Sequence, residues 1–140
     1  MVLLLAAATV ITSCSKDDDN NSGGGGTTPV TNTSKLCNKN WKIQSAKFNG
    51  IDVTSQFFDP CELDNFLRFN TNGSYTADEG ATKCDTASPQ TNTGTWSWAV
   101  NETKLVIDGD TADMLTNSGT ALKLGITDPA LGTVEINFGL

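Results

Sequence analysis

The second half of the chain alternates apolar and polar residues with a period of two. Four segments put their large apolar side chains on one face, at residues 96–100, 105–107, 122–126 and 134–138. This period is typical of antiparallel strands with one buried face, and no stretch shows a convincing 3.6-residue period of an amphipathic helix. We therefore expect these segments to be strands that cover a common core.

The first half of the chain shows the same alternation less regularly. Trp41 and Ile43 share one phase, whereas Ala46 and Phe48 fall in the opposite phase. A bulge or bend at residues 44–45 would bring all four side chains to one face, and we predict it there. Further strands are expected at residues 67–69, 75–77 and 112–116.

About eight short strands, joined mostly by hairpins, indicate an all-β domain. Consecutive hairpins favour a small up-and-down antiparallel barrel, because closing the sheet removes its exposed edges. A two-sheet β-sandwich would give a similar pattern and is the alternative. Two longer stretches, residues 52–64 and 80–92, are polar or interrupted by proline, so we expect them to be loops at the rim of the barrel.

The amino terminus has the features of an export signal. Residues 2–11 are apolar, but a permanent transmembrane helix needs ~20 such residues. The run ends at Ile11-Thr12-Ser13-Cys14, which resembles the lipobox of bacterial lipoproteins, whose cysteine is acylated and becomes the first mature residue. We expect residues 1–13 to be a signal peptide and the acylated Cys14 to anchor the protein in a lipid bilayer. An ordinary cleaved signal is the alternative.

The segment after Cys14 is polar and rich in Asp, Gly and Thr. Because it has almost nothing to bury, we expect residues 14–35 to be a disordered tether and residues 36–140 to be the folded domain. Lys16 followed by three aspartates is similar to the surface-export signal of some Gram-negative lipoproteins, although a plain acidic linker would look the same. The expected location is the outer membrane of a Gram-negative bacterium. The resemblance to a surface-export signal favours the side of this membrane that faces the cell exterior.

The composition excludes several functional classes. The chain has 9 Lys and Arg against 16 Asp and Glu, a net charge of −7, which argues against nucleic acid as a partner. It has no histidine, which excludes Ser-His-Asp and Cys-His catalysis and His-ligated zinc. No nucleophile–base pair can be assembled from the other residues. We therefore expect a binding protein that is not an enzyme and that uses no cofactor.

Three cysteines remain after Cys14, and an exported protein meets an oxidising environment. We predict a disulfide between Cys61 and Cys84, which lie in the two irregular stretches that flank the predicted hairpin of Leu67 and Tyr75. Cys37 is left over, unless the thiols pair in another way. A metal site is disfavoured, because the thiols are far apart in sequence and the chain has no CxxC motif.

A series of short motifs follows the tether along the chain. In order, it includes Trp41-Lys42-Ile43, Asn49-Gly50, Asp59-Pro60-Cys61, Asn72-Gly73-Ser74-Tyr75, Cys84 and Gly94-Thr95-Trp96. Together with the lipobox, these motifs resemble the lipocalin-like domain of bacterial outer-membrane lipoproteins. The resemblance implies a small antiparallel barrel, commonly with a cavity.

We expect the barrel to bind a small apolar or amphipathic molecule. Its candidate lining is the set of bulky aromatic residues predicted to face inward: Trp41, Phe69, Tyr75, Trp96 and Trp98. The same side chains would instead simply fill the core of a barrel without a cavity. In that alternative, the protein is a surface interaction module that contacts a partner through its rim loops, with Phe57 and Phe58 exposed.

Overall fold

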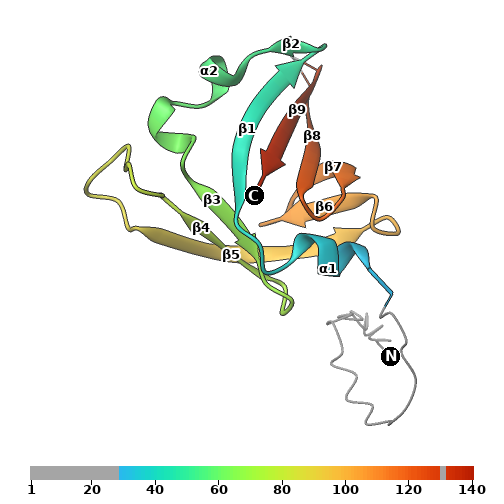
Figure 1. The fold of residues 1–140 in the computed structure, drawn as a ribbon. Helices are drawn as coiled ribbons and strands as arrows, with labels where there is room; N and C mark the ends of the chain where they lie inside the picture. The colour runs from blue at the N-terminus through green and yellow to red at the C-terminus, as the bar shows by residue number, and fades with distance from the viewer. Residues whose placement is uncertain (1–28, 130–131) are drawn as a thin grey trace, which may run out of the picture.

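The computed structural model describes residues 29–129 and 132–140 (Figure 1). In this part of the chain, nine strands form one antiparallel sheet in the order β2-β1-β3-β4-β5-β6-β7-β8-β9. A further pairing of β1 with β9 closes the sheet into a barrel of eight strands, with β2 as an additional short strand beside β1. The bounds are β1 Trp41–Phe48, β2 Ile51–Asp52, β3 Phe66–Phe69, β4 Ser74–Asp78, β5 Thr91–Ala99, β6 Lys104–Ile107, β7 Asp110–Asn117, β8 Ala121–Asp128 and β9 Gly132–Gly139.

The predicted antiparallel barrel is therefore confirmed, and the sandwich is not formed. From β3 onward each strand pairs with the next one in sequence, as in an up-and-down meander. Local turn chemistry supports this order: Asp108 and Gly109, which join β6 to β7, have φ values of 49° and 94°. Positive φ at both central residues is the requirement of the tight hairpin turn for which Asp-Gly is favoured.

The predicted bulge in β1 is also confirmed. Pairing of β1 with β9 shifts register between Ile43 and Ser45, so that Gln44 is the additional residue. Trp41 and Ala46, which lie on either side of the bulge, are both completely buried. The bulge thus keeps both halves of β1 facing the interior despite their opposite phases.

One predicted strand is too long. The alternation of Trp96 and Trp98 continues through Val100 in the sequence, but β5 ends at Ala99. Val100 has a φ of 48° and is 62% exposed, because it begins the turn into β6.

A short helix, α1 (Asn32–Leu36), covers one end of the barrel, which we call the closed end (Figure 1). Leu36 is completely buried there, and its carbonyl oxygen accepts a hydrogen bond from Trp41 Nε1 at 2.8 Å. Trp98 Nε1 donates to Thr33 Oγ1 at 3.0 Å. The folded domain therefore begins before residue 36, and residues 32–35 belong to the barrel's cover and not to a disordered tether. The expected signal peptide, Cys14 and most of the tether lie outside the described residues.

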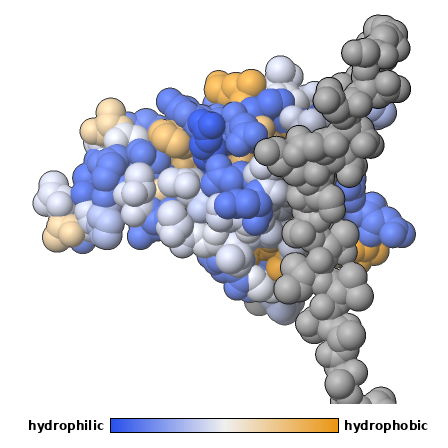
Figure 2. All heavy atoms as spheres, turned by 90° about the horizontal axis from the view of Figure 1, so that it is seen from below, coloured by the Kyte–Doolittle hydropathy of each residue, from blue (hydrophilic) through white to orange (hydrophobic). Residues whose placement is uncertain are grey.

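The closed end is filled by aromatic side chains. The Phe69 and Trp96 rings meet edge to face with centroids 5.7 Å apart, and Trp96 meets Trp98 in the same way at 5.7 Å. Trp96 Nε1 donates to the carbonyl oxygen of Asn70 at 2.9 Å, so the indole is satisfied as well as packed. Figure 2 shows this end from outside, where polar side chains predominate and apolar ones are scattered.

The helices of the described chain are short. α1 has five residues, and the second α-helix, α2 (Thr54–Phe57), has four. Neither qualifies as a candidate membrane span.

Candidate functional site

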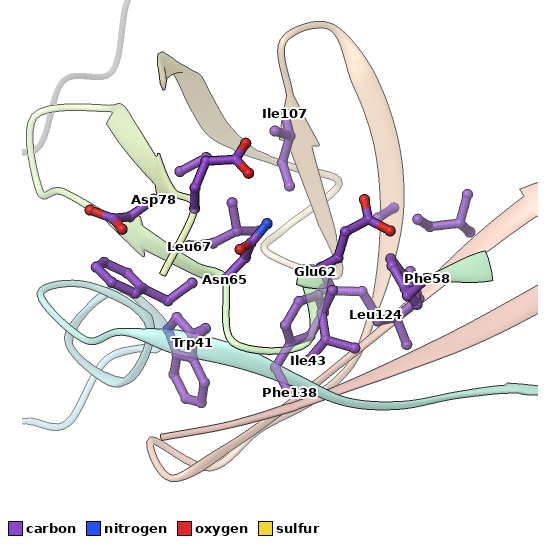
Figure 3. Close-up of a pocket in the computed structure, with 16 residues that line it drawn as sticks. Trp41, Ile43, Phe58, Glu62, Asn65, Leu67, Asp78, Ile107, Leu124 and Phe138 are labelled. Atoms are coloured by element: carbon purple, nitrogen blue, oxygen red, sulfur yellow. The ribbon is translucent and has the colours of Figure 1, made fainter. Parts of the chain in front are cut away.

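The half of the barrel on the other side of Trp41 from the closed end contains a cavity of about 310 Å³ (Figure 3). Its walls are mostly apolar side chains, among them the aliphatic Ile43, Leu67, Ala77, Leu124 and Ile136 of the strands. Four residues belong both to this lining and to the buried cluster that includes the aromatic residues of the closed end, and they form the floor of the cavity: Trp41, Ala112, Leu124 and Phe138. The volume lies at the lower end of the range for small-molecule sites, and the apolar wall is typical of them.

The cavity reaches the side of the barrel where β1 and β3 part. β1 pairs with β3 only at Trp41 and Lys42. At its other end, Lys47 and Phe48 pair with β2 instead. The connection between β2 and β3, residues 53–65, spans the gap and contributes Phe58, Glu62 and Asn65 to the cavity lining.

A disulfide holds this connection in place. Cys61 lies in the 3-10 helix η1 (Pro60–Glu62) and is bonded to Cys84 in the loop between β4 and β5, with the two Cα atoms 5.3 Å apart. The predicted pairing is therefore confirmed. η1 is also capped locally, because the backbone N–H of Asp59 donates to Glu62 Oε2 at 2.7 Å.

Asp64 provides a second link between the same two loops. Its Oδ2 accepts hydrogen bonds from the backbone N–H groups of Ala81 and Thr82, both at 2.9 Å. Gly80 lies so close that a Cβ atom there would be 2.5 Å from the Asp64 carbonyl oxygen, and its φ is +65°. Only glycine combines this conformation with this contact. The loop side of the cavity is thus held by covalent and polar contacts as well as by packing.

Four polar side chains line the cavity on this loop side: Glu62, Asn65, Asp78 and Glu79. With its side-chain amide turned so that the nitrogen faces these acceptors, Asn65 donates to the backbone carbonyl oxygens of Glu79 at 2.6 Å and Cys61 at 3.3 Å, and so links η1 to the residue after β4. In Figure 3, Asp78, Asn65 and Glu62 lie on one side of the cavity, and Trp41, Ile43 and Phe138 lie on the other. The cavity therefore has an apolar wall and an acidic margin.

The structure distributes the predicted aromatic residues differently from the expectation. Of the five, Trp41 alone lines the cavity. Phe69, Trp96 and Trp98 pack at the closed end, and Tyr75 packs beside them. Alternation predicts which face of a strand is inward, but it does not give the height of a residue along the barrel axis.

Phe57 and Phe58, the two phenylalanines of the predicted rim loop, differ in their exposure. Phe57, in α2, is 47% exposed. Phe58 is half-buried, lines the cavity and packs on a small cluster of Ala46, Val53 and Val134. The exposed pair that the alternative function required is therefore a single exposed ring.

Tyr75 makes a polar contact outside the cavity. Its hydroxyl donates to Asp108 Oδ2 at 2.6 Å, and the Thr95 N–H donates to Asp108 Oδ1 at 2.8 Å. Chiefly because of the hydrogen bond to Asp108, the pKa of Tyr75 is raised. The same bond, followed by the Thr95 N–H, lowers the pKa of Asp108.

Replacing Tyr75 with phenylalanine is expected to lower the urea midpoint of unfolding at neutral pH but not at strongly acidic or strongly alkaline pH. The lowered pKa of Asp108 means that its stabilisation is present above the ordinary carboxyl pKa of ~3.9 and is lost as the pH falls through the folded value. The raised pKa of Tyr75 means that its stabilisation is present below ~10 and is lost as the pH rises through the folded value. The urea midpoints of the wild-type protein and Tyr75→Phe, measured across pH, should become equal at low pH and at high pH. A difference that stays constant with pH would contradict this assignment.

Within residues 29–129 and 132–140, no group of three or more His, Cys, Asp or Glu side chains is placed to hold a metal ion. A scan of the chain against protein-family models and a search of curated proteins found no match. The function of the site is therefore inferred from its own geometry and chemistry.

Proposed function

We propose that this protein is an exported, lipid-anchored lipoprotein of the lipocalin-like kind, whose barrel binds a small apolar or amphipathic molecule. The observation that carries the binding function is the cavity of about 310 Å³ with an aliphatic wall. An apolar cavity of this size favours small-molecule binding over a barrel filled by its own side chains. The proposed role is binding without catalysis.

A substitution that fills the cavity tests this function. Ala77 lies on β4 and lines the cavity, so a phenylalanine at this position places its ring in the space that a ligand would occupy. The apolar fluorophore N-phenylnaphthylamine is expected to bind saturably to the wild-type protein, with brighter emission, and about tenfold or more weakly to Ala77→Phe.

The neighbouring Thr76 gives a matched control. Alternate residues of a strand point to opposite faces, so Thr76→Phe adds the same ring to the outer surface of β4. This variant should bind the fluorophore as the wild-type protein does. Absence of binding by the wild-type protein, or equal binding by Ala77→Phe in its folded form, would contradict the proposed function.

The anchor needs a separate test, because Cys14 lies outside the described residues. In the full-length protein expressed in a Gram-negative host, Cys14→Ala is expected to abolish incorporation of labelled palmitate. It should also move the protein from the membrane fraction to the soluble exported fraction, because acyl chains provide the attachment. The Cys37→Ala variant controls for loss of a thiol elsewhere. Unchanged membrane association of Cys14→Ala would contradict lipid anchoring.

A further inference from the structure

We propose that the cavity selects amphipathic cations, in which an apolar body fills the barrel and an amine or a similar positive group sits at the acidic margin. This inference rests on the proposed binding function and adds the charge of the ligand to it. It follows from which side chains line the cavity and from where the basic side chains of the molecule lie.

Every ionisable side chain that lines the cavity is acidic. Glu62 comes from η1, and Asp78 and Glu79 come from the end of β4 and the residue after it. All three are half-buried, so water screens their charges less completely than on an open surface. A ligand in the cavity would therefore experience a field that favours positive charge and opposes negative charge.

The protein does not neutralise this margin with its own cations. No Lys or Arg of the described chain lines the cavity. Lys104 and Lys123 pair with Asp113 and Glu135 on the outer wall. Arg68 is exposed on the outer face of β3.

Two further lysines donate to backbone carbonyl oxygens and not to the carboxylates of the margin. Lys39 Nζ donates to the carbonyl oxygens of Lys35 and Gly119 at 2.9 and 2.7 Å, at the closed end. Lys83, which lies in the loop between β4 and β5, donates to the carbonyl oxygen of Ser88. Among the described residues, no Lys or Arg forms an ion pair with Glu62, Asp78 or Glu79, so these carboxylates are open to a positive group on a ligand.

Two of the carboxylates are held in position by the loops. Glu62 Oε2 accepts the Asp59 N–H at 2.7 Å. Asp78 Oδ1 accepts from the Gly80 N–H and from Gln90 Nε2, both at 2.9 Å. An ionised carboxyl group has about four lone-pair sites, so each retains capacity for a further donor, and an ammonium group offers three. The margin is thus a set of positioned hydrogen-bond acceptors, and no basic side chain of the described residues lines the cavity beside them.

Three probes with one hydrocarbon chain and different head groups test the inference: decylamine, decanol and decanoate. Each is titrated as a competitor of N-phenylnaphthylamine on the oxidised protein at neutral pH and low salt. Because only the head group differs, decylamine should bind about tenfold more tightly than decanol, and decanoate should bind least tightly. Added salt should narrow these differences.

Two of the three negative charges of the margin are then removed with little change in side-chain shape, and Asp78 is retained. Glu62→Gln combined with Glu79→Gln keeps an acceptor for the Asp59 N–H and is expected to weaken decylamine about tenfold while leaving decanol unchanged. The matched control is Asp113→Asn combined with Glu135→Gln, which removes two negative charges from the outer wall. It should leave all three affinities unchanged.

The outcomes separate this inference from the binding function. Cation selection is overturned if decanoate binds as tightly as decylamine. It is also overturned if the margin variant keeps its decylamine affinity, or if the outer-wall control loses as much decylamine affinity as the margin variant. If the fluorophore binds and decylamine does not displace it, cation selection is likewise overturned. If the fluorophore itself does not bind to the wild-type protein, the binding function fails.

Discussion

Leu36→Ala is expected to lower the free energy of unfolding by about 2–5 kcal/mol, the range for deleting a large aliphatic side chain from a core. Leu36 is the last residue of α1, is completely buried and belongs to the cluster of Trp41, Phe69 and Trp96. Its carbonyl still accepts the Trp41 indole hydrogen bond in the variant, so the loss is one of packing.

Urea unfolding followed by tryptophan fluorescence measures this effect, because all three tryptophans of the chain belong to, or pack against, the same buried cluster. Val30, which is 72% exposed, provides the control, and Val30→Ala should change the free energy of unfolding by less than about 0.5 kcal/mol. A loss below about 1 kcal/mol for Leu36→Ala would show that α1 is not part of the cooperative fold.

The double variant Cys61→Ser and Cys84→Ser is expected to lose about 3 kcal/mol of unfolding free energy. The bond joins residues separated by 23 positions, and the chain-entropy model gives about 3.4 kcal/mol for a closed loop of that size. The oxidised wild-type protein and the double variant are compared by urea unfolding, with and without a reductant.

The reductant provides an internal control for this comparison. It should lower the stability of the wild-type protein to about that of the double variant and leave the double variant unchanged. Because the disulfide joins η1 to the loop after β4, backbone amides of residues 59–65 should also exchange hydrogen faster when it is absent. A wild-type protein that is equally stable in both redox states would contradict the expected contribution.

Local pattern was sufficient for much of the barrel. The bulge at Gln44 followed from the phase change between Ile43 and Ala46, because only an additional residue puts both on one face. The disulfide followed from the position of Cys61 and Cys84 in the two irregular stretches that the structure brings together. The bulge depends on residues that are neighbours in the sequence, and the disulfide depends on the order of the hairpins, so both could be predicted.

Features that depend on tertiary packing were not predictable in this way. α1 carries a single buried residue, Leu36, so its pattern gave no helical period, and its packing on the closed end determines it. The acidic margin was missed because Glu62 and Asp78 come to line the same cavity only when residues 53–65 span the gap between β1 and β3. The signal that could have indicated it was the proximity of Glu62 to the paired Cys61.

Both ends of the described chain lie on one side of the molecule. α1 covers the closed end, and β9 finishes beside Lys42 of β1 and Ala121 of β8 at the same end. A fluorescent protein or an affinity tag fused after Leu140 would therefore leave the cavity unobstructed, so the barrel can be immobilised or turned into a ligand sensor through its carboxyl end. Insertions at residues 85–88, in contrast, would place the added domain in the loop that carries the disulfide.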